Sequence, residues 1–195
     1  MIIWINGAFG SGKTTCAFEL NRRLKKSIIY DPENVGYFIR KNIPKELHEP
    51  DFQDHKEWRS FNFEMLTFIN TNYDRIIIVP MTLTNRKYYE EIITRLIDNK
   101  VEVKHSILSA EKETLEKCLK SRLESKNSWA NQQIDRCINS FNKEITEEKI
   151  LTDSMSIDSI VEEIAKRSGI ILSDDNRSYI RKKFDRLYIF FKNIK

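Results

Sequence analysis

The chain has 195 residues and a net charge of +4, and 40% of its residues are hydrophobic while 32% are charged. This length and balance predict one globular domain with room for a small appendage. The weak positive charge does not by itself indicate a nucleic-acid partner, and we expect none. The three widely spaced cysteines argue against a structural zinc site and fit a reducing cytoplasm. No apolar run is long enough to span a membrane and no secretory signal pattern is present, so we expect a cytoplasmic protein.

The first predicted element is a buried strand over residues 2–5, which leads into a glycine-rich loop and then a helix. The loop has the full P-loop pattern Gly7-x-x-x-x-Gly12-Lys13-Thr14 in the strand–loop–helix context that the pattern requires. Glycines permit positive φ angles, so backbone N–H groups can turn toward phosphate oxygens, and the first helical turn adds further N–H groups. We expect Lys13 to reach the β- and γ-phosphates of ATP, and the Thr14 hydroxyl to bind Mg²⁺. The predicted nucleotide-binding residues of the loop are Gly7, Ala8, Phe9, Gly10, Ser11, Gly12, Lys13, Thr14 and Thr15.

The rest of the chain alternates between short apolar runs, which predict strands, and stretches with helical spacing. The further expected strands are 27–30, 75–79, 101–108 and 149–153, and the expected helices are 13–26, 35–43, 55–72, 88–97, 111–123, 129–141 and 156–167. This alternation behind a P-loop predicts a three-layer α/β/α sandwich with a five-stranded parallel sheet, as in nucleoside-kinase-like P-loop proteins. We assign residues 1–172 to this domain and residues 173–195 to a C-terminal basic amphipathic helix.

Residues that directly follow the strands are candidates for the site, because ligands of parallel sheets bind at the carboxyl ends of the strands. This rule places the P-loop, Asp31, Thr82 and Asp153 along one rim. Asp31 ends the second strand, which we expect next to the P-loop strand. A carboxylate there can accept the proton of an acceptor hydroxyl, although a turn aspartate before proline is the alternative interpretation. We expect Asp153 to lie beside the nucleotide.

The third strand ends in Val79-Pro80-Met81-Thr82 and lacks the acidic residue of a Walker B motif. A motor-type ATPase needs that carboxylate, whereas kinases can hold Mg²⁺ through the P-loop hydroxyl, phosphates and water. The sequence therefore favours phosphoryl transfer over a motor ATPase. Thr82 is a candidate for contact with substrate or Mg²⁺-bound water, and a plain strand end is equally compatible with it.

Residues 33–72 form the segment in which small P-loop kinases place the acceptor. Arginine suits planar anions and aromatic rings can stack a base, so Arg40, Trp58 and Arg59 are candidate substrate-binding residues. The aromatic residues of this segment also have the helical spacing of a core stripe, which is the alternative for most of them.

Residues 111–141 form the expected lid, whose cations stabilise charge on the transferred phosphoryl group. Arg122, at the end of the first lid helix, is the predicted catalytic cation beside Lys13 and the base Asp31. Arg136, on the second lid helix, is predicted to bind substrate.

The segment 174–195 places aromatic and aliphatic residues at helical spacing and basic residues largely elsewhere. This pattern predicts a basic amphipathic helix, which can lie on an anionic membrane surface or dock on the core; both hold if the helix swings out. The expected apolar face consists of Ile180, Phe184, Leu187, Tyr188, Phe191 and Ile194.

Several blocks of sequence together resemble the bacterial tunicamycin resistance protein (TmrB) family. The blocks are WINGAFGSGKT (4–14), YDPE (30–33), DFQ (51–53), WRSFN (58–62), IVPMT (78–82), KNSWA (126–130), QIDRC (133–137) and TD (152–153). The resemblance covers almost the whole chain, and the family looks like a branch of the small kinases related to nucleoside monophosphate, shikimate and chloramphenicol kinases. It implies ATP binding, protection against tunicamycin and membrane association through the C-terminal helix. Tunicamycin is a fatty-acylated uridine nucleoside, which a site mixing arginine, aromatic and apolar side chains would suit.

Three functions are compatible with these residues. The first is an ATP–Mg²⁺-dependent phosphotransferase acting on a hydroxyl of a small nucleoside-like molecule such as tunicamycin. The second is ATP-dependent sequestration of such a molecule at the membrane without chemistry. The third is a soluble nucleotide kinase in which Arg40 and Arg59 hold the acceptor phosphate. The expected partners are thus ATP, a nucleoside-like substrate and an anionic membrane surface, with a cytoplasmic and peripheral membrane location.

Overall fold

The computed structural model describes residues 1–121, 124–125 and 127–192, and its strands form a parallel sheet in the order β2-β3-β1-β4-β5. In the central strands, Ile3 lies between Ile78 on one side and Lys104 on the other. The strands are β1 (Ile2–Gly7), β2 (Ser27–Ile29), β3 (Ile76–Pro80), β4 (Val103–Ser109) and β5 (Lys149–Leu151). The predicted five-stranded parallel sheet is confirmed.

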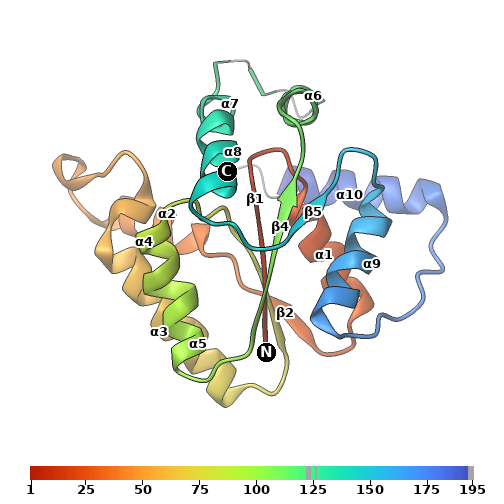
Figure 1. Ribbon diagram of the computed structural model, residues 1–195, viewed down its shortest axis with the longest axis horizontal. Coiled ribbons are helices and arrows are strands. Elements are labelled where there is room, and N and C mark those ends of the chain that lie inside the picture. Colours follow the sequence, from red (N-terminus) through yellow and green to blue (C-terminus); the bar gives the residue numbers. More distant parts are fainter. Residues whose placement is uncertain (122–123, 126, 193–195) are drawn as a thin grey trace.

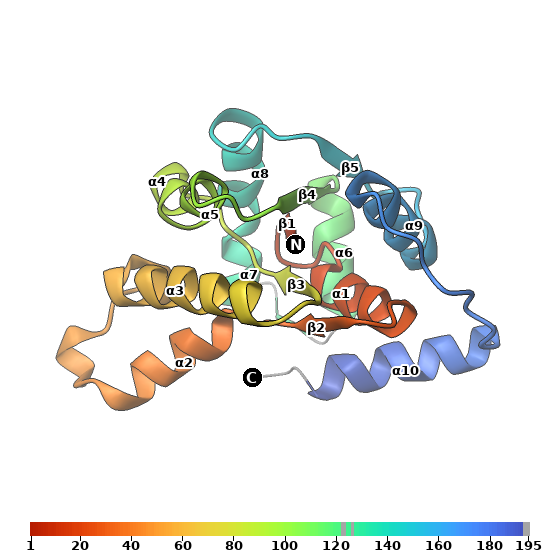
Figure 2. The ribbon, with the colours of Figure 1, turned by 90° about the horizontal axis from the view of Figure 1, so that it is seen from below.

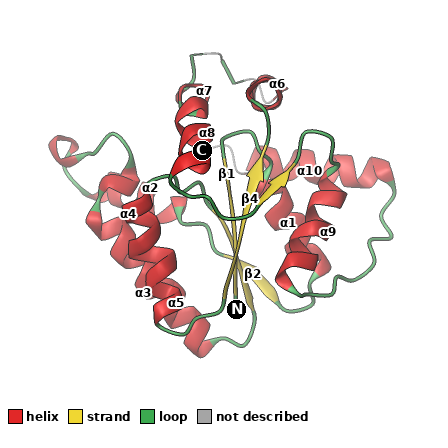
Figure 3. Ribbon diagram, viewed as in Figure 1, coloured by secondary structure: helices red, strands yellow, loops and turns green. Residues whose placement is uncertain are grey.

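Helices cover both faces of this sheet (Figure 1; Figure 3 colours the same view by secondary structure). The described helices are α1 (Lys13–Arg23), α2 (Glu33–Asn42), α3 (Lys56–Asn72), α4 (Arg86–Tyr89), α5 (Arg95–Asp98), α6 (Lys112–Ser121), α7 (Trp129–Gln132), α8 (Ile134–Lys143), α9 (Ile157–Ser168) and α10 (Tyr179–Lys192). A π-helical segment, η3 (Glu90–Thr94), joins α4 to α5, and the expected loop before α3 contains two short 3-10 turns, η1 (Lys45–Leu47) and η2 (Phe52–Asp54).

The buried central strand β1 divides the core into two parts, because successive side chains of a strand point to opposite faces. Ile2 and Trp4 pack in one cluster with residues of α3, η3, α6 and α8. Ile3 and Ile5 pack in the other with residues of α1 and α9. Figure 2 shows the sheet between these helices, and the predicted three-layer α/β/α sandwich is confirmed.

Several helix boundaries differ from expectation for local reasons. The expected helix 129–141 is divided into α7 and α8 at Gln133, whose N–H is shared between the carbonyls of Trp129 and Ala130. Bifurcation of this kind marks the tightened last turn of a helix. The C-terminal helix begins later than expected, where the Ser178 hydroxyl accepts the backbone N–H of Arg181 as a cap does.

The expected apolar face of α10 does not face the core. Of its described side chains, Ile180, Phe184, Leu187 and Tyr188 are exposed, while Ile189 is buried. The side chain of Phe191 and the whole of Ile194 lie outside the described residues. None of the described helices is both long enough and apolar enough to cross a membrane.

Candidate functional site

The loop between β1 and α1 has the backbone of a phosphate cradle. Gly7, Gly10 and Gly12 have φ angles of 146°, 86° and 91°. A Cβ on Gly7 would lie 2.7 Å from the carbonyl oxygen of Leu108, and one on Gly10 would lie 2.8 Å from that of Leu115, so neither position has room for a side chain. Gly12 is the N-cap of α1 and caps it with no side chain. The helix N-terminus, with its dipole, therefore faces the loop without a competing side-chain acceptor.

Two polar side chains of the loop suit an anionic ligand. The Ser11 hydroxyl is buried and finds no hydrogen-bond partner among the described residues. Lys13 Nζ donates to the Ala8 carbonyl at 3.0 Å and lies 5.5 Å from the centre of the Phe9 ring. A phosphate oxygen would give Ser11 the acceptor that it lacks and Lys13 a charged one. These residues therefore fit the phosphates of a nucleotide.

The first turn of α1 offers a hydroxyl that can serve as an oxygen ligand for a metal ion. Across the described part of the chain, no three His, Cys, Asp or Glu side chains cluster in a way that would hold a metal ion. Thr14 lies in the first turn of α1, directly after Lys13. Mg²⁺ commonly keeps several waters and takes few protein ligands beside the phosphates, so this site suits it.

The segment after β3 is tied to the P-loop by buried hydrogen bonds. Asn6 donates to the Leu83 carbonyl at 2.9 Å, and its carbonyl oxygen accepts the N–H groups of Gly7 and Leu83, each at 2.9 Å. The Thr82 hydroxyl donates to the Gly7 carbonyl at 2.9 Å and is 4% exposed. The structure thus places Thr82 beside the P-loop, where it fixes the loop backbone.

Asp31 follows β2 on the same rim, but its strand is not beside the P-loop strand as expected. β3 lies between β2 and β1, because β2 pairs only with β3 in the described sheet. Two steps between neighbouring strands correspond to about 10 Å, so Asp31 lies one strand farther from the P-loop strand than expected. Burial raises the pKa of Tyr30 above its ordinary value and that of Tyr37 to about 12, and the nearby Asp31 carboxylate adds to both increases.

A second carboxylate near the P-loop, Asp51, was not among the predicted site residues. It is 8% exposed, accepts the backbone N–H of Gln53 at 3.1 Å and pairs with Arg136 of α8 at 3.3 Å. Burial raises the pKa of the Cys137 thiol, while the charges of Lys13 and Arg136 oppose this increase and Asp51 adds to it. The structure therefore pairs Asp51 with Arg136 on the same helix, α8, that carries Cys137. Asp51 lies in an irregular segment, where no periodic pattern reveals a buried acid.

The acceptor candidates Trp58 and Arg59 lie inside the protein. Trp58 is fully buried and donates to the Pro32 carbonyl at 2.9 Å. Arg59 donates to the carbonyls of Gln53 and Asp54 at 2.7 and 2.9 Å and pairs with Glu91. Trp58 therefore ties α3 to the start of α2, and Arg59 ties α3 to the turn that precedes it.

Arg40, on α2, also contacts backbone carbonyls of its own segment. Its guanidinium donates to the carbonyls of Glu49 and Pro50 at 3.2 and 2.8 Å and lies 5.7 Å from the centre of the Phe52 ring. The structure therefore does not bring Arg40 and Arg59 together as a pair facing the P-loop; each is bound by its own loop.

The expected lid, residues 111–141, is described apart from residues 122, 123 and 126. Arg122 lies outside the described residues. The Trp129 ring packs edge-on against Phe9 of the P-loop, with ring centres 5.1 Å apart. Asp153 follows β5 and accepts the backbone N–H of Glu111 at 3.0 Å. Hydrogen bonds from the Thr114 side chain and from backbone N–H groups lower its pKa. The segment expected to form the lid is thus anchored both to the P-loop and to the end of β5.

Comparisons with known proteins agree with this geometry. Residues 1–103 match the family described as adenylylsulphate kinase. The chain is similar to the structure of the tunicamycin resistance protein of Deinococcus radiodurans, with 28% identity, a TM-score of 0.76, and coverage of 89% of this chain and 98% of that chain. No match to a curated protein was found. The resemblance to tunicamycin resistance proteins is confirmed.

Two further solved structures share the fold. The gluconokinase of Sinorhizobium meliloti 1021 has 15% identity and a TM-score of 0.61, covering 86% of this chain and 90% of that chain. The APS kinase of Mycobacterium tuberculosis, solved with AMPPNP and APS, has 15% identity and a TM-score of 0.57, covering 85% of this chain and 95% of that chain. At these identities the likeness concerns the fold alone.

Proposed function

The chain belongs to the adenylylsulphate kinase family, and from this premise we propose that it transfers a phosphoryl group from ATP to a hydroxyl of a small nucleoside-like molecule, such as tunicamycin. The observation that carries the proposal is the geometry of the P-loop. Its glycines have positive φ angles, and its buried Ser11 hydroxyl has no hydrogen-bond partner among the residues that the structure describes, so both suit a phosphate group. The likeness to a tunicamycin resistance protein supports the choice of acceptor class.

The P-loop side has a positioning and electrostatic role in this reaction. The backbone of residues 7–12 and the N-terminus of α1 would hold the phosphates, and Lys13 would move from the Ala8 carbonyl to the β- and γ-phosphate oxygens. The Thr14 hydroxyl would help to hold Mg²⁺, which would supply positive charge to neutralise the phosphates. Asp153 would lie near the base of the nucleotide.

The acceptor side supplies a base and a mobile cation. Asp31, across β3 from the P-loop, would accept the proton of the attacking hydroxyl. Arg136, whose side chain is 48% exposed and pairs with Asp51, can turn toward a transferred phosphoryl group, a role that Arg122 would share. Trp58, Arg59 and Arg40 would act indirectly, by holding the acceptor segment, and Thr82 by fixing the P-loop.

Product mass decides the proposal. Incubation with ATP–Mg²⁺ and tunicamycin should give a product heavier by one phosphoryl group, about 80 Da. Asp31→Asn should lower turnover by about 10²–10⁴-fold, the usual contribution of a general base, while nucleotide still protects the protein from unfolding. A matched control is Asp74→Asn, an exposed acid before β3. Full turnover by Asp31→Asn would remove Asp31 from the role of base.

Sequestration without chemistry is the second candidate, because α10 exposes an aromatic face that suits a membrane surface. The drug would then be recovered unchanged after incubation with ATP–Mg²⁺, while still binding in a nucleotide-dependent way. The third candidate, a nucleotide kinase with Arg40 and Arg59 on the acceptor phosphate, receives less support because both guanidinium groups contact backbone carbonyls. Under either of the first two functions we propose a cytoplasmic protein that associates peripherally with membranes.

A further inference from the structure

The C-terminal helix α10 lies on the core through its charged side. Its outward residues are Tyr179, Ile180, Phe184, Leu187 and Tyr188, which are between 49% and 78% exposed. The residues that face the core are Lys182, Arg186 and Ile189, spaced as one face of a helix. The amphipathic helix is therefore inverted relative to an ordinary docked terminal helix, whose apolar side is buried.

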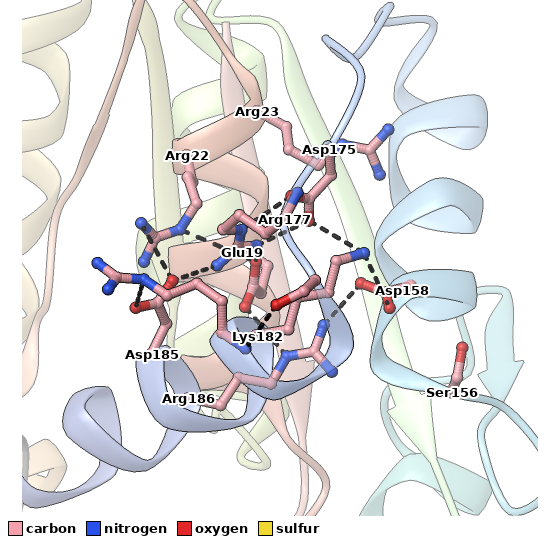
Figure 4. A network of polar contacts seen from close by, with 12 residues as sticks. Glu19, Arg22, Arg23, Ser156, Asp158, Asp175, Arg177, Lys182, Asp185 and Arg186 are labelled. Carbon is pink, nitrogen blue, oxygen red and sulfur yellow. Dashed lines mark hydrogen bonds and ion pairs between the residues drawn. The ribbon is translucent and has the colours of Figure 1, made fainter.

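Glu19 on α1 is the centre of the contact that holds α10. It is 1% exposed, so its charge depends on partners within the protein. Arg186 donates to Glu19 Oε1 at 3.0 Å, and Arg177, just before α10, donates to Glu19 Oε2 (Figure 4). Arg22 is 4.0 Å away and its side chain is 42% exposed. If α10 left, Glu19 would lose both hydrogen-bonded cations.

A second group of contacts holds α10 to α9. Arg186 donates to Asp158 at 2.6 Å, and Lys182 lies 3.5 Å from Asp158 and 3.2 Å from Asp175. Hydrogen bonds from Arg177 hold the pKa of Asp175 well below its ordinary range although burial opposes them, so this carboxylate stays charged. We call the whole network the charged clasp; its members are Glu19, Asp158, Asp175, Arg177, Lys182, Asp185 and Arg186.

We propose that α10 contacts an anionic membrane surface while it stays docked on α1 and α9, with the charged clasp intact. The aromatic face already points outward, so lipid contact does not require the helix to swing out. Arg181 pairs with Asp185 at 3.2 Å, but its side chain is 72% exposed, so its guanidinium remains accessible to anionic headgroups beside that face. This inference rests on the membrane association proposed above and specifies how it occurs.

Docked contact would fix the orientation of the site relative to the membrane. In Figure 2, α2 and α10 lie along the same side of the molecule. α2 belongs to the proposed acceptor segment, so a lipid-dissolved acceptor would reach this segment from the membrane side. A helix that swung out on residues 170–178 would leave that orientation free.

A distance between two labels tests the docked contact. Lys183→Cys on α10 and Lys166→Cys on α9 place labels at exposed positions outside the clasp and outside the apolar face. Cys118→Ser provides the background, since the other two cysteines are buried. The label separation is measured in the full chain with and without vesicles containing phosphatidylserine. The same separation in both states is expected, and a longer separation on vesicles would overturn docked contact.

Vesicle binding and label distance together distinguish a failure of docked contact from a failure of the membrane association on which it rests. Binding to phosphatidylserine vesicles with a changed label distance refutes only the docked geometry. No binding by the parent protein refutes the proposed membrane association, and docked contact with it.

Substitutions on the outward face identify the lipid-contacting side chains. Phe184→Ser removes an apolar side chain that is 66% exposed, so vesicle binding should weaken by about tenfold or more. The matched control is Ile171→Ser, which removes a side chain that is 94% exposed but lies before α10. Equal binding by Phe184→Ser and the parent would show that another surface contacts the lipid.

Discussion

Helix α1 carries two polar regions that differ in how their groups are satisfied. At its N-terminus the P-loop leaves the buried Ser11 hydroxyl without a hydrogen-bond partner among the described residues, and Lys13 donates to the neutral carbonyl of Ala8. Further along, the charged clasp surrounds Glu19 with arginines. Polar groups whose hydrogen bonds and charges are fully paired within the chain stabilise the fold. Polar groups that can still form a hydrogen bond suit an external ligand. The same helix therefore positions a ligand site and anchors a terminal helix.

Breaking the clasp should have the largest effect on stability. Glu19→Ala would leave Arg177 and Arg186 without their shared carboxylate, and removing one partner of a buried ion pair costs about 3–5 kcal/mol. Urea unfolding should show this loss. Glu163→Ala, which removes a partly exposed i,i+4 pair with Arg167 on α9, is the control and should cost about 0.5 kcal/mol or less. A similar small loss for Glu19→Ala would mean that the clasp contributes little to stability.

Substitution in the P-loop should affect nucleotide binding strongly and the stability of the protein alone very little. Lys13→Ala should leave the unfolding free energy of the protein alone nearly unchanged but remove most of the stabilisation by ATP–Mg²⁺. The expected loss in nucleotide affinity or turnover is about 10²–10³-fold, as for other preorganised charge contacts. Thermal unfolding with increasing nucleotide measures it, with Lys25→Ala, an exposed residue after α1, as the control. Equal nucleotide stabilisation of Lys13→Ala and the parent would refute the assignment of the P-loop.

A third polar group shows that a missing partner alone does not make a ligand site. Both ring nitrogens of His105 on β4 are buried and have no hydrogen-bond partner within the described part of the chain. The ring packs against Tyr89, with centres 5.3 Å apart, and no glycine cradle surrounds it. Burial lowers the pKa of His105 to about 4 from its usual 6.5, and the nearby Glu147 carboxylate partly opposes this.

The stability that depends on neutral His105 should therefore be complete above pH 6.5 and be lost as pH falls from 6.5 toward 4, because the unfolded chain takes up the proton first. The difference between the parent and His105→Phe should change by about 2 kcal/mol between pH 7.5 and pH 5 in urea unfolding. Nucleotide stabilisation should be the same in both proteins. A difference that does not vary with pH would contradict the burial of a neutral imidazole.

Ser11→Ala should give the smallest effect and the sharpest contrast. Without nucleotide it removes a buried hydroxyl that lacks a partner, so the free energy of unfolding should stay the same or rise by about 1 kcal/mol. With ATP–Mg²⁺ the variant should gain less stability than the parent. Thermal unfolding of the two proteins with and without nucleotide measures both changes in stability. A loss of stability without nucleotide would show that the Ser11 hydroxyl forms a hydrogen bond within the fold.

The local patterns predicted the elements that depend on neighbouring residues. The apolar run at residues 2–5 and the continuous run 75–79 identified the central strands, because strands buried on both faces need unbroken apolar sequence. Ser156 and Gly169 marked both ends of α9, since a capping hydroxyl and a left-handed glycine act within one turn. Boundaries such as the division at Gln133 depend on packing and were not predictable.

The sequence predicted only that part of the candidate site whose residues come from one continuous stretch. Residues 7–15 could be identified because one loop supplies the whole cradle. Asp51 and Arg136 are 85 residues apart, so their contact depends on how two separate segments pack. Burial of Trp58 and Arg59 depends in the same way on carbonyls from other segments: Pro32 before α2 accepts from Trp58, and the turn before α3 accepts from Arg59.

The sequence by itself determined the P-loop, the parallel sheet and the amphipathic character of the last helix, because each follows from spacing along the chain. Only the tertiary structure decided that β3 separates Asp31 from the P-loop strand and that α10 turns its charged side to the core. The physical reason is that a helical pattern shows which residues share a face but not what that face meets. A single buried carboxylate on α1, Glu19, supplies the partner that selects the charged face.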